Sequence, residues 1–327
     1  MHNLSKNSFF IGIDLGGTKI STGIVDTSGK ILAKIKLPTQ AQKGPEFVIV
    51  QIVKSINLVI KESKLNREQI SGIGIGAPGT LNTEKGIVHF APNLPGWKEI
   101  PLKNKLESKT GFSVFVDNDA NLAALGESWI GAGKGSKNLI CITLGTGVGG
   151  GLILNGEIYH GSEDSAGEIG HITVEPSGPK CNCGNNGCLE AYSSATGIVN
   201  RTKEAIKSGE KTSLKEPITS KKVYLEALKG DKLSKRIMKQ AGLYLGIALS
   251  NVANLLNLDM AIIAGNVAEA GEMIFEPARK EIKKRAIYPA NKMKLVPAKL
   301  GTDAGIIGSA RLVMIKKFLY NKLQMQM

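Results

Sequence analysis

The sequence lacks any long apolar run. No stretch approaches the roughly 20 apolar residues that a helix needs to cross a bilayer, and the apolar run at 9–13 is too short for the hydrophobic region of a signal peptide. These two absences argue against a membrane protein and against export. We therefore expect a soluble, cytoplasmic protein without a membrane partner.

Aromatic residues are scarce, at 5% of the chain. The net charge is strongly positive, because 42 Lys and Arg against 28 Asp and Glu give +14. The lysines are dispersed, and no basic patch is interleaved with aromatic residues in the way that nucleic-acid recognition favours. We expect no nucleic-acid partner. A positive field also favours anionic substrates such as nucleotides and phosphates.

Cysteine is rare as well, and three of the four cysteines, Cys181, Cys183 and Cys188, lie close together after His171. Three thiolates and an imidazole are a standard ligand set for a closed tetrahedral zinc site. Disulfides are the alternative, but Cys181 and Cys183 are too close to pair easily and nothing else indicates an oxidising compartment. Cys141 lies in an apolar run and is interpreted as a core residue.

The 327 residues, 42% of them hydrophobic, suffice for two domains. Strands followed by strands and then helices occur twice, which predicts two α/β lobes with mixed sheets, packed around a cleft because no linker separates them. We expect strands at 8–13, 20–25, 31–36, 70–75, 114–116, 138–144 and 260–264. We expect helices at 45–65, through Trp129, at 232–256 and at 304–317.

Two glycine-rich segments, at 14–19 and 144–151, each read as strand, turn and strand. Glycines let backbone N–H groups approach phosphate oxygens, and a carboxylate at a strand end, Asp14, can hold Mg²⁺ directly or through water. Ordinary tight hairpins are the alternative, but five glycines within 145–151 exceed that need. The formal dinucleotide-binding spacing at 145–150 is set aside because a strand and an Asn-Gly hairpin follow it, not a helix. The glycine-rich segment 131–136 has the wrong order for a P-loop and is expected to be a loop.

A polar cluster, Asp117-Asn118-Asp119-Ala120-Asn121, lies where a strand ends and a helix begins. Capping of the helix is an equally good interpretation of Asp117. Capping does not require four polar residues in five positions, and a carboxylate here is well placed to act as a general base toward a bound hydroxyl.

Taken together, these motifs resemble the ROK branch (repressor, open reading frame, kinase) of the actin/hexokinase/Hsp70 superfamily. The segments 14–19 and 144–151 resemble its two phosphate motifs, Asn118-Asp119 its catalytic pair, and 168–171 with 181–190 its zinc signature. The resemblance runs from about residue 10 to 310. It implies an α/β, two-lobed actin-like ATPase (ribonuclease H-like) fold with a cleft between the lobes and a zinc-binding loop. The smaller lobe would comprise 1–118 plus 305–327 and the larger one 119–304.

The resemblance also implies an activity, the ATP-dependent phosphorylation of glucose at the 6-hydroxyl by a homodimer, with Asp119 as general base. The substrate would contact Pro78, Gly79, Asn93, Asn118, Asp119, Glu168, His171 and Glu190. Mg²⁺ and ATP would be held by Asp14, Gly16, Gly17, Thr18, Lys19, Gly145, Thr146, Gly147, Gly149, Gly150, Gly151, Gly265 and Asn266. A structural Zn²⁺ would be ligated by His171, Cys181, Cys183 and Cys188.

Three points qualify this interpretation. The family's glycine turn near adenosine is reduced here to Ala264-Gly265-Asn266, which leaves the nucleotide preference open. A kinase for N-acetylmannosamine or another hexosamine is the sibling alternative, because a small loop at Pro78-Gly79 or at Glu190 would admit an N-acetyl group. A sugar-sensing repressor would carry a DNA-binding module before the first glycine turn. Only thirteen residues precede Asp14, so we do not expect that module.

Overall fold

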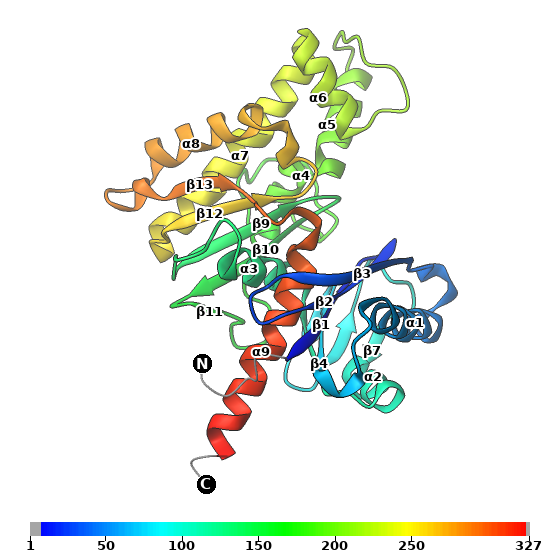
Figure 1. The fold of residues 1–327 in the computed structure, drawn as a ribbon. Coiled ribbons are helices and arrows are strands. Elements are labelled where there is room, and N and C mark those ends of the chain that lie inside the picture. Colours follow the sequence, from blue (N-terminus) through cyan, green and yellow to red (C-terminus); the bar gives the residue numbers. More distant parts are fainter. Residues whose placement is uncertain (1–7, 325–327) are drawn as a thin grey trace. The chain divides into compact units, whose positions relative to one another are not determined.

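The computed structural model describes residues 8–324, with side chains as far as 319, and divides into two compact units (Figure 1). The first unit contains the described residues through Gly135, the segment Glu157–Ala166, and the residues from Thr302 onward. The second contains Ser136–Gly156 and Gly167–Gly301. The first unit thus includes residues 119–135, which the sequence analysis assigned to the larger lobe. None of the helices in the described part of the chain is long and apolar enough to span a membrane.

The first unit is built on a mixed five-stranded sheet with the order β3-β2-β1-β4-β8. The hairpin pairs are antiparallel, whereas β1, β4 and β8 run parallel, as the expected mixed sheet requires. A small antiparallel sheet of three short strands, β5, β6 and β7, was not expected. The strands are β1 (Phe9–Leu15), β2 (Lys19–Val25), β3 (Ile31–Pro38), β4 (Ile70–Ala77), β5 (Thr80–Asn82), β6 (Ile87–Phe90), β7 (Lys98–Ile100) and β8 (Val114–Asn118).

Strand β1 sends alternate side chains to two different cores because successive residues of a strand point to opposite faces. Ile11 and Ile13 are buried with residues of helix α1, whereas Phe10 is buried with Ile306 and Ala310 of helix α9. The two helices therefore cover opposite faces of the sheet (Figure 1). The helices of this unit are α1 (Pro45–Ser63), α2 (Leu102–Thr110), α3 (Asp119–Trp129) and α9 (Ala304–Gln324).

Helix α9 approaches the sheet closely because two strand positions on its side are glycines. A Cβ on Gly12 would lie 1.9 Å from the carbonyl oxygen of Ile306, and one on Gly74 would lie 1.9 Å from that of Ser309. Neither position has room for a side chain. The glycines of β1 and β4 thus fix the depth at which α9 packs.

The second unit contains a sheet in which β9 pairs antiparallel with β10 and parallel with β12, and β12 pairs parallel with β13. Strand β10 is followed by the expected turn at Asn155-Gly156 and a short strand, β11, so the glycine-rich segment continues as strand and turn. The strands of this unit are β9 (Leu139–Leu144), β10 (Val148–Leu154), β12 (Met260–Ala264) and β13 (Lys294–Pro297), whereas β11 (Glu157–Ile158) belongs to the first unit.

The long helix predicted at 232–256 is present with those bounds as α7. Helix α8, which was not expected, lies against it: a Cβ on Gly242 would meet the carbonyl oxygen of Ile274 at 2.4 Å, and one on Gly246 would meet that of Ala278 at 2.6 Å. The helices of this unit are α4 (Leu189–Ser193), α5 (Ala195–Lys207), α6 (Ser220–Lys229), α7 (Lys232–Leu256) and α8 (Glu272–Arg285).

Candidate functional site

In the first unit, three parallel strands end at one edge of the sheet. Asp14 of β1 is in register with Gly76 of β4, and Gly76 is in register with Asp117 of β8. The residues that follow these positions therefore gather at one edge, beyond the carboxyl ends of parallel strands, where α/β proteins commonly bind ligands. Asn118 and Asp119 lie at this edge, at the junction of β8 and α3.

The first glycine turn is held by short contacts to its backbone. The amide of Gly16 donates to the carbonyl of Lys19 at 3.0 Å, and the Thr39 hydroxyl donates to the carbonyl of Gly16 at 2.6 Å. A Cβ on Gly17 would lie 2.8 Å from the carbonyl oxygen of Asn93. The fold thus brings Asn93, a predicted sugar ligand, against the predicted phosphate turn.

Asp14 is a carboxyl group in a largely buried place. Burial raises its pKa above the ordinary value, and the positive charge of Lys19 opposes that shift. A Cβ on Gly305, at the start of the 21-residue helix α9, would lie 3.0 Å from the Asp14 side chain. The carboxylate form would gain from the positive end of this helix and from a nearby cation. Asp14 therefore suits the predicted role of holding Mg²⁺ with a nucleotide.

Asn118 begins helix α3 as its N-cap. Its side-chain oxygen accepts from the amides of Ala120 at 2.9 Å and Asn121 at 3.3 Å, and its Nδ2 donates to the carbonyl of Gly79 at 3.2 Å. Asp119 also accepts from the Ala120 amide, at 2.8 Å. Three predicted substrate ligands, Gly79, Asn118 and Asp119, are thus close together in the first unit.

Asp117 does not cap the helix, because Asn118 does so. Asp117 is 1% exposed, and its carboxylate accepts from the Asn118 amide at 2.7 Å, from Asn121 Nδ2 at 3.0 Å and from His160 Nε2 at 2.8 Å. This hydrogen bond raises the pKa of His160. The sequence analysis did not single out His160, since its partner lies 43 positions away and no local pattern links them. Only the burial of Asp117, which the structure shows, indicates that its carboxylate has a basic partner.

The second glycine turn, in the second unit, is held by a carboxylate. The Gly145 amide donates to the carbonyl of Gly147 at 3.0 Å, and the Val148 amide donates to Glu190 Oε2 at 2.9 Å. A Cβ on Gly147 would lie 2.4 Å from that Glu190 oxygen. Glycine is therefore needed at 147 for Glu190, a predicted sugar ligand, to reach the turn.

The altered turn at 264–266 lies beside the second glycine turn because β9 and β12 are parallel, with Thr143 in register with Ala264. The Val267 amide donates to the carbonyl of Leu144 at 3.1 Å. Gly265 has a φ of +90°, and a Cβ there would lie 2.4 Å from the carbonyl oxygen of Leu144. The single glycine that this chain retains thus stands where both conformation and space require one.

His171 and the three neighbouring cysteines form one cluster, with their ligand atoms all within 4.8 Å of one another. His171 Nδ1 lies 3.9 Å from Cys181 Sγ, and Cys183 Sγ lies 3.6 Å from Cys188 Sγ. Sulfurs at the corners of a zinc tetrahedron with 2.3 Å bonds are about 3.8 Å apart. None of the three cysteines forms a disulfide, so the disulfide alternative is wrong.

Two of the three thiols of this cluster resist ionisation, whereas a hydrogen bond from the Asn185 amide lowers the pKa of Cys183. Burial and the neighbouring thiols raise the pKa of Cys188 to about 12, and burial also raises the pKa of Cys181. A metal ion would offset both effects, since metal binding displaces protons from thiols. The donor set and its geometry therefore fit a metal ion.

Glu190 joins the Cys3His cluster to the second glycine turn. Its Oε1 lies 3.9 Å from Cys181 Sγ, while its Oε2 holds the Val148 amide. Glu168 immediately precedes the short 3₁₀ helix η3 (Ile169–His171), in which a Cβ on Gly170 would meet the Val148 carbonyl oxygen at 2.2 Å. The predicted sugar ligands Glu168, His171 and Glu190 therefore belong to the second unit, around the cluster, and the others belong to the first.

Known proteins resemble this chain along almost its whole length. A family model described as the ROK family matches residues 10–316. The chain is 40% identical to a protein from Halalkalibacterium halodurans named glucokinase, over 94% of this chain and 96% of that one. It is 32% identical to the xylose repressor of Bacillus subtilis, over 94% of this chain and 77% of the repressor.

A solved structure shares the fold along nearly the whole chain. The crystal structure of a ROK family glucokinase from Streptomyces griseus, in complex with glucose and AMPPNP, matches with a TM-score of 0.78 and 34% identity. The match covers 93% of this chain and 99% of that one. On the extent of the family match and of these similarities, the chain belongs to the ROK family.

Proposed function

We propose that this chain is an ATP-dependent hexose kinase that phosphorylates glucose at the 6-hydroxyl. The proposal is carried by one observation: Asn118, Asp119 and Gly79 lie close together at the carboxyl ends of β4 and β8, at one edge of the first sheet. Similarity to glucokinases over more than nine-tenths of the chain supports the substrate, and the Streptomyces griseus structure was solved with glucose and a nucleotide.

In the proposed reaction Asp119 is the general base. It accepts the proton of the sugar's 6-hydroxyl while that oxygen forms a bond to the γ-phosphorus of ATP. The bond from the γ-phosphorus to the bridging oxygen breaks, and ADP leaves with the electron pair. Asn118, fixed by its cap and by Gly79, would orient the attacking hydroxyl.

Phosphoryl transfer depends mainly on positioning and on charge neutralisation. We assign the positioning of the phosphates to backbone amides of the turns at 16–19 and 145–151, and the adenosine region to Gly265 and Asn266. Mg²⁺ bound with the nucleotide supplies positive charge to the phosphate oxygens. Asp14 would hold that ion directly or through water, as its place beside the positive end of α9 favours.

We assign the remaining sugar contacts to Asn93, Glu168, His171 and Glu190, since carboxylates and amides pair well with pyranose hydroxyls. Zinc is the metal proposed for the Cys3His cluster, where four protein ligands complete a tetrahedron and leave no position for a catalytic water. His171 would bind zinc through Nδ1, which faces Cys181, and would leave Nε2 for the sugar. The metal would thus act through protein side chains. The predicted homodimer is open to measurement by light scattering.

A coupled assay of ADP release tests the proposal. Glucose, mannose, N-acetylglucosamine and N-acetylmannosamine are compared with Mg²⁺ and ATP, and Asp119→Asn is the control for background ATP hydrolysis. We expect kcat/KM to be highest with glucose. A higher value with N-acetylmannosamine would favour the hexosamine kinase, and the absence of sugar-dependent ADP release would contradict the kinase.

The 32% identity to a xylose repressor supports a second candidate, a sugar-responsive regulator. Such a protein binds a sugar without transferring phosphate. Calorimetric sugar binding together with an inactive coupled assay would favour it, whereas sugar-dependent ADP release at enzymatic rates would contradict it.

A further inference from the structure

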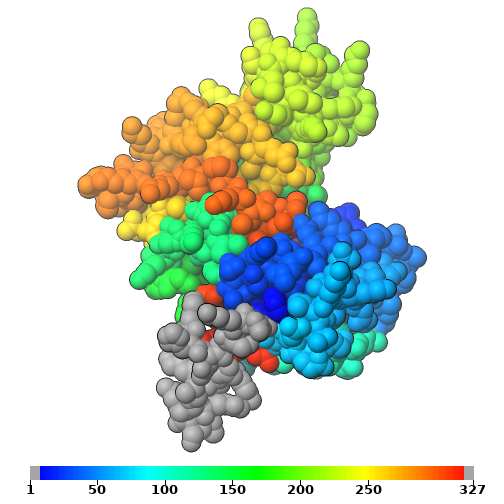
Figure 2. Space-filling model, in the orientation of Figure 1, coloured from blue at the N-terminus to red at the C-terminus, as the bar shows by residue number. Residues whose placement is uncertain are grey.

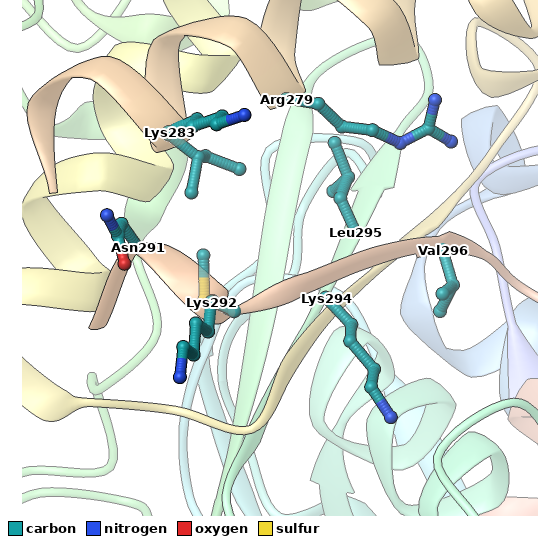
Figure 3. A pocket seen from close by; sticks show the side chains of 9 residues that line it. Arg279, Lys283, Asn291, Lys292, Lys294, Leu295 and Val296 are labelled. Carbon is teal, nitrogen blue, oxygen red and sulfur yellow. The ribbon is translucent and has the colours of Figure 1, made fainter. Parts of the chain in front are cut away.

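A pocket of about 510 Å³ lies outside the candidate site, between α8 and the segment formed by the 3₁₀ helix η5 (Ala290–Lys292) and β13 (Figure 3). This stretch of chain, orange in Figure 2, is at the surface of the second unit. The apolar residues that line the pocket, Ile282, Met293 and Leu295, are only 2%, 7% and 6% exposed and offer a ligand almost no surface. Lys294 points away from α8 (Figure 3), so it does not face the cations of that helix. We assign this pocket no ligand.

A buried carboxylate in the first unit, that of Asp117, holds the residues on both sides of Asp119. Asp117 Oδ1 accepts from the Asn118 amide at 2.7 Å and from Asn121 Nδ2 at 3.0 Å. Asn118 is the N-cap of α3 and Asn121 lies in its first turn, so the two donors flank Asp119, the first residue of the helix. Asp117 therefore restrains the stretch of backbone from which the proposed general base extends.

The side chain of Asn121 depends on this carboxylate. Asn121 is 2% exposed, and within the described residues its Oδ1 is buried without a hydrogen-bond partner. Its Nδ2 is the atom that Asp117 holds. Loss of that bond would leave a second polar atom of a buried amide unsatisfied, which costs free energy because neither water nor protein would replace the partner. Asp117 thus fixes a side chain of the first turn as well as the N-cap.

His160 holds the same carboxylate through its other oxygen. His160 Nε2 donates to Asp117 Oδ2 at 2.8 Å, and His160 belongs to the segment Glu157–Ala166 of the same unit. This segment has an anchor of its own, because Asp164 accepts from the Thr83 amide at 3.0 Å and from the Thr83 hydroxyl at 2.9 Å. An ionised carboxylate that is 1% exposed needs such a partner, since burial removes the water that would otherwise solvate its charge. His160 supplies the partner and sets the direction of the carboxylate.

Neither capping nor stability requires this arrangement. Asn118 already caps α3, since its side-chain oxygen accepts from the amides of Ala120 and Asn121. A buried ion pair is often no more stabilising than apolar residues of the same volume. Positioning of a reactive group accounts for the pair better, because a small displacement of such a group lowers the rate steeply.

Resting on the function proposed above, we propose that His160 and Asp117 are positioning residues for the general base. Asp117 restrains the residues on both sides of Asp119, and His160 fixes the orientation of the Asp117 carboxylate. No proton is transferred from either residue in the reaction. Their effect should fall on kcat and much less on glucose affinity, because most of the assigned sugar contacts belong to other parts of the chain.

Coupled assays of ADP release by the full chain test the proposal with His160→Ala and His160→Gln. His160→Ala removes the donor and should lower kcat by about tenfold, while calorimetry shows glucose affinity changed by less than about threefold. His160→Gln retains an N–H donor at the reach of Nε2 and should recover most of the lost kcat. His89→Ala is the matched control, because His89 pairs with Glu99 at 2.9 Å elsewhere in the same unit, and it should turn over like the parent.

A double-variant cycle with Asp119→Asn separates positioning from a merely structural role. If His160 acts through Asp119, then His160→Ala should lower the residual kcat of the Asp119→Asn protein no further, because no base is left to position. Asp117→Asn keeps the volume of the buried side chain, removes its charge, and should show the same loss of kcat and the same dependence on Asp119.

Three outcomes would contradict the proposal in different ways. Parental kcat in both His160→Ala and Asp117→Asn would overturn it and leave the kinase in place. An equal loss of kcat with and without Asp119 would also overturn it, since the pair would then act on the structure in general. A parent without sugar-dependent ADP release would contradict the proposed function, and this inference with it.

Discussion

The two glycine turns are built alike but held differently. Each connects antiparallel strands, β1 to β2 and β9 to β10, and each has a parallel strand beside it. The first turn is held by the Thr39 hydroxyl on Gly16, whereas the second is held by the Glu190 carboxylate on Val148. Only the second support also lies against the Cys3His cluster, with Glu190 Oε1 3.9 Å from Cys181 Sγ.

The difference teaches that the two units depend on different interactions. In the first unit, Asn118 and Asp119 are positioned by the end of β8 and by the cap of α3. In the second, Glu190 is positioned between the Cys3His cluster and the glycine turn. Loss of the proposed metal should therefore impair the second unit's functions and leave Asp119, the proposed general base in the first unit, in place. The predictions below challenge this division, beginning with the largest effect.

Asp119→Asn should lower kcat by at least about 100-fold, the lower range for loss of a proton acceptor. The amide retains an oxygen that can accept from the Ala120 amide but cannot take the proton of the 6-hydroxyl. Steady-state kinetics measure kcat, and calorimetry should show that glucose binding and the metal content are retained. Turnover close to that of the parent would remove Asp119 from the proposed reaction.

Cys183→Ala should lose the metal, which should copurify with the parent at about one ion per chain. We expect a lower Tm and glucose binding weakened by at least about tenfold, the scale of contacts just outside a metal's ligands. The buried Cys141, outside the cluster, provides the control: Cys141→Ala should keep the metal. Elemental analysis and calorimetry report the two results. If the metal-free variant binds glucose like the parent, the coupling through His171 and Glu190 is wrong.

Gly265→Ala should reduce stability by about 1–3 kcal/mol and weaken nucleotide binding, because it combines a φ of +90° with a Cβ only 2.4 Å from the Leu144 carbonyl oxygen. Gly156→Ala is the matched control, with a φ of +85° and nothing within 4 Å of an added Cβ. It should cost about 1–2 kcal/mol, from conformation alone. Chemical denaturation compares the two, and equal losses in stability would mean that the close approach to Leu144 has no energetic weight.

His160→Gln should produce the smallest effect, and one that depends on pH. The hydrogen bond that His160 donates to Asp117 raises the pKa of His160, so the folded protein holds the His160 proton more tightly than the unfolded chain does. The resulting stability is fully present below the ordinary value of 6.5 and is lost as the pH rises through the raised pKa. Parent and variant should therefore differ most at acidic pH, by on the order of 1 kcal/mol or less.

Denaturation at several pH values measures this difference. His89→Gln, which removes an exposed imidazole paired with Glu99, controls for the loss of a surface histidine. A difference between the parent and His160→Gln that does not change between pH 5 and pH 9 would mean that the pair with Asp117 is not charged in the folded protein.

Much of the fold could be predicted from the periodic spacing of apolar residues and from the residues typical of turns. The bounds of α7 were predicted in full, and β9 and β12 to within one residue. The small sheet of β5, β6 and β7 could not be predicted, because strands of three or four residues are too short for alternation to be visible. Helix α8 was missed even though its buried positions, such as Ile274 and Ala278, follow a helical spacing.

The sequence by itself determined the chemical inventory: the Cys3His set, the glycines of the two turns, and the Asn118-Asp119 pair at a strand end. Residue type and local spacing suffice for these. The tertiary structure alone decided that Asp117 binds His160, that Glu190 links Cys181 to Val148, and that Gly265 meets Leu144. The contacts of Asp117 with His160, of Glu190 with Val148 and of Gly265 with Leu144 join residues distant along the chain. Their approach depends on strand order, register and packing, which no local pattern encodes.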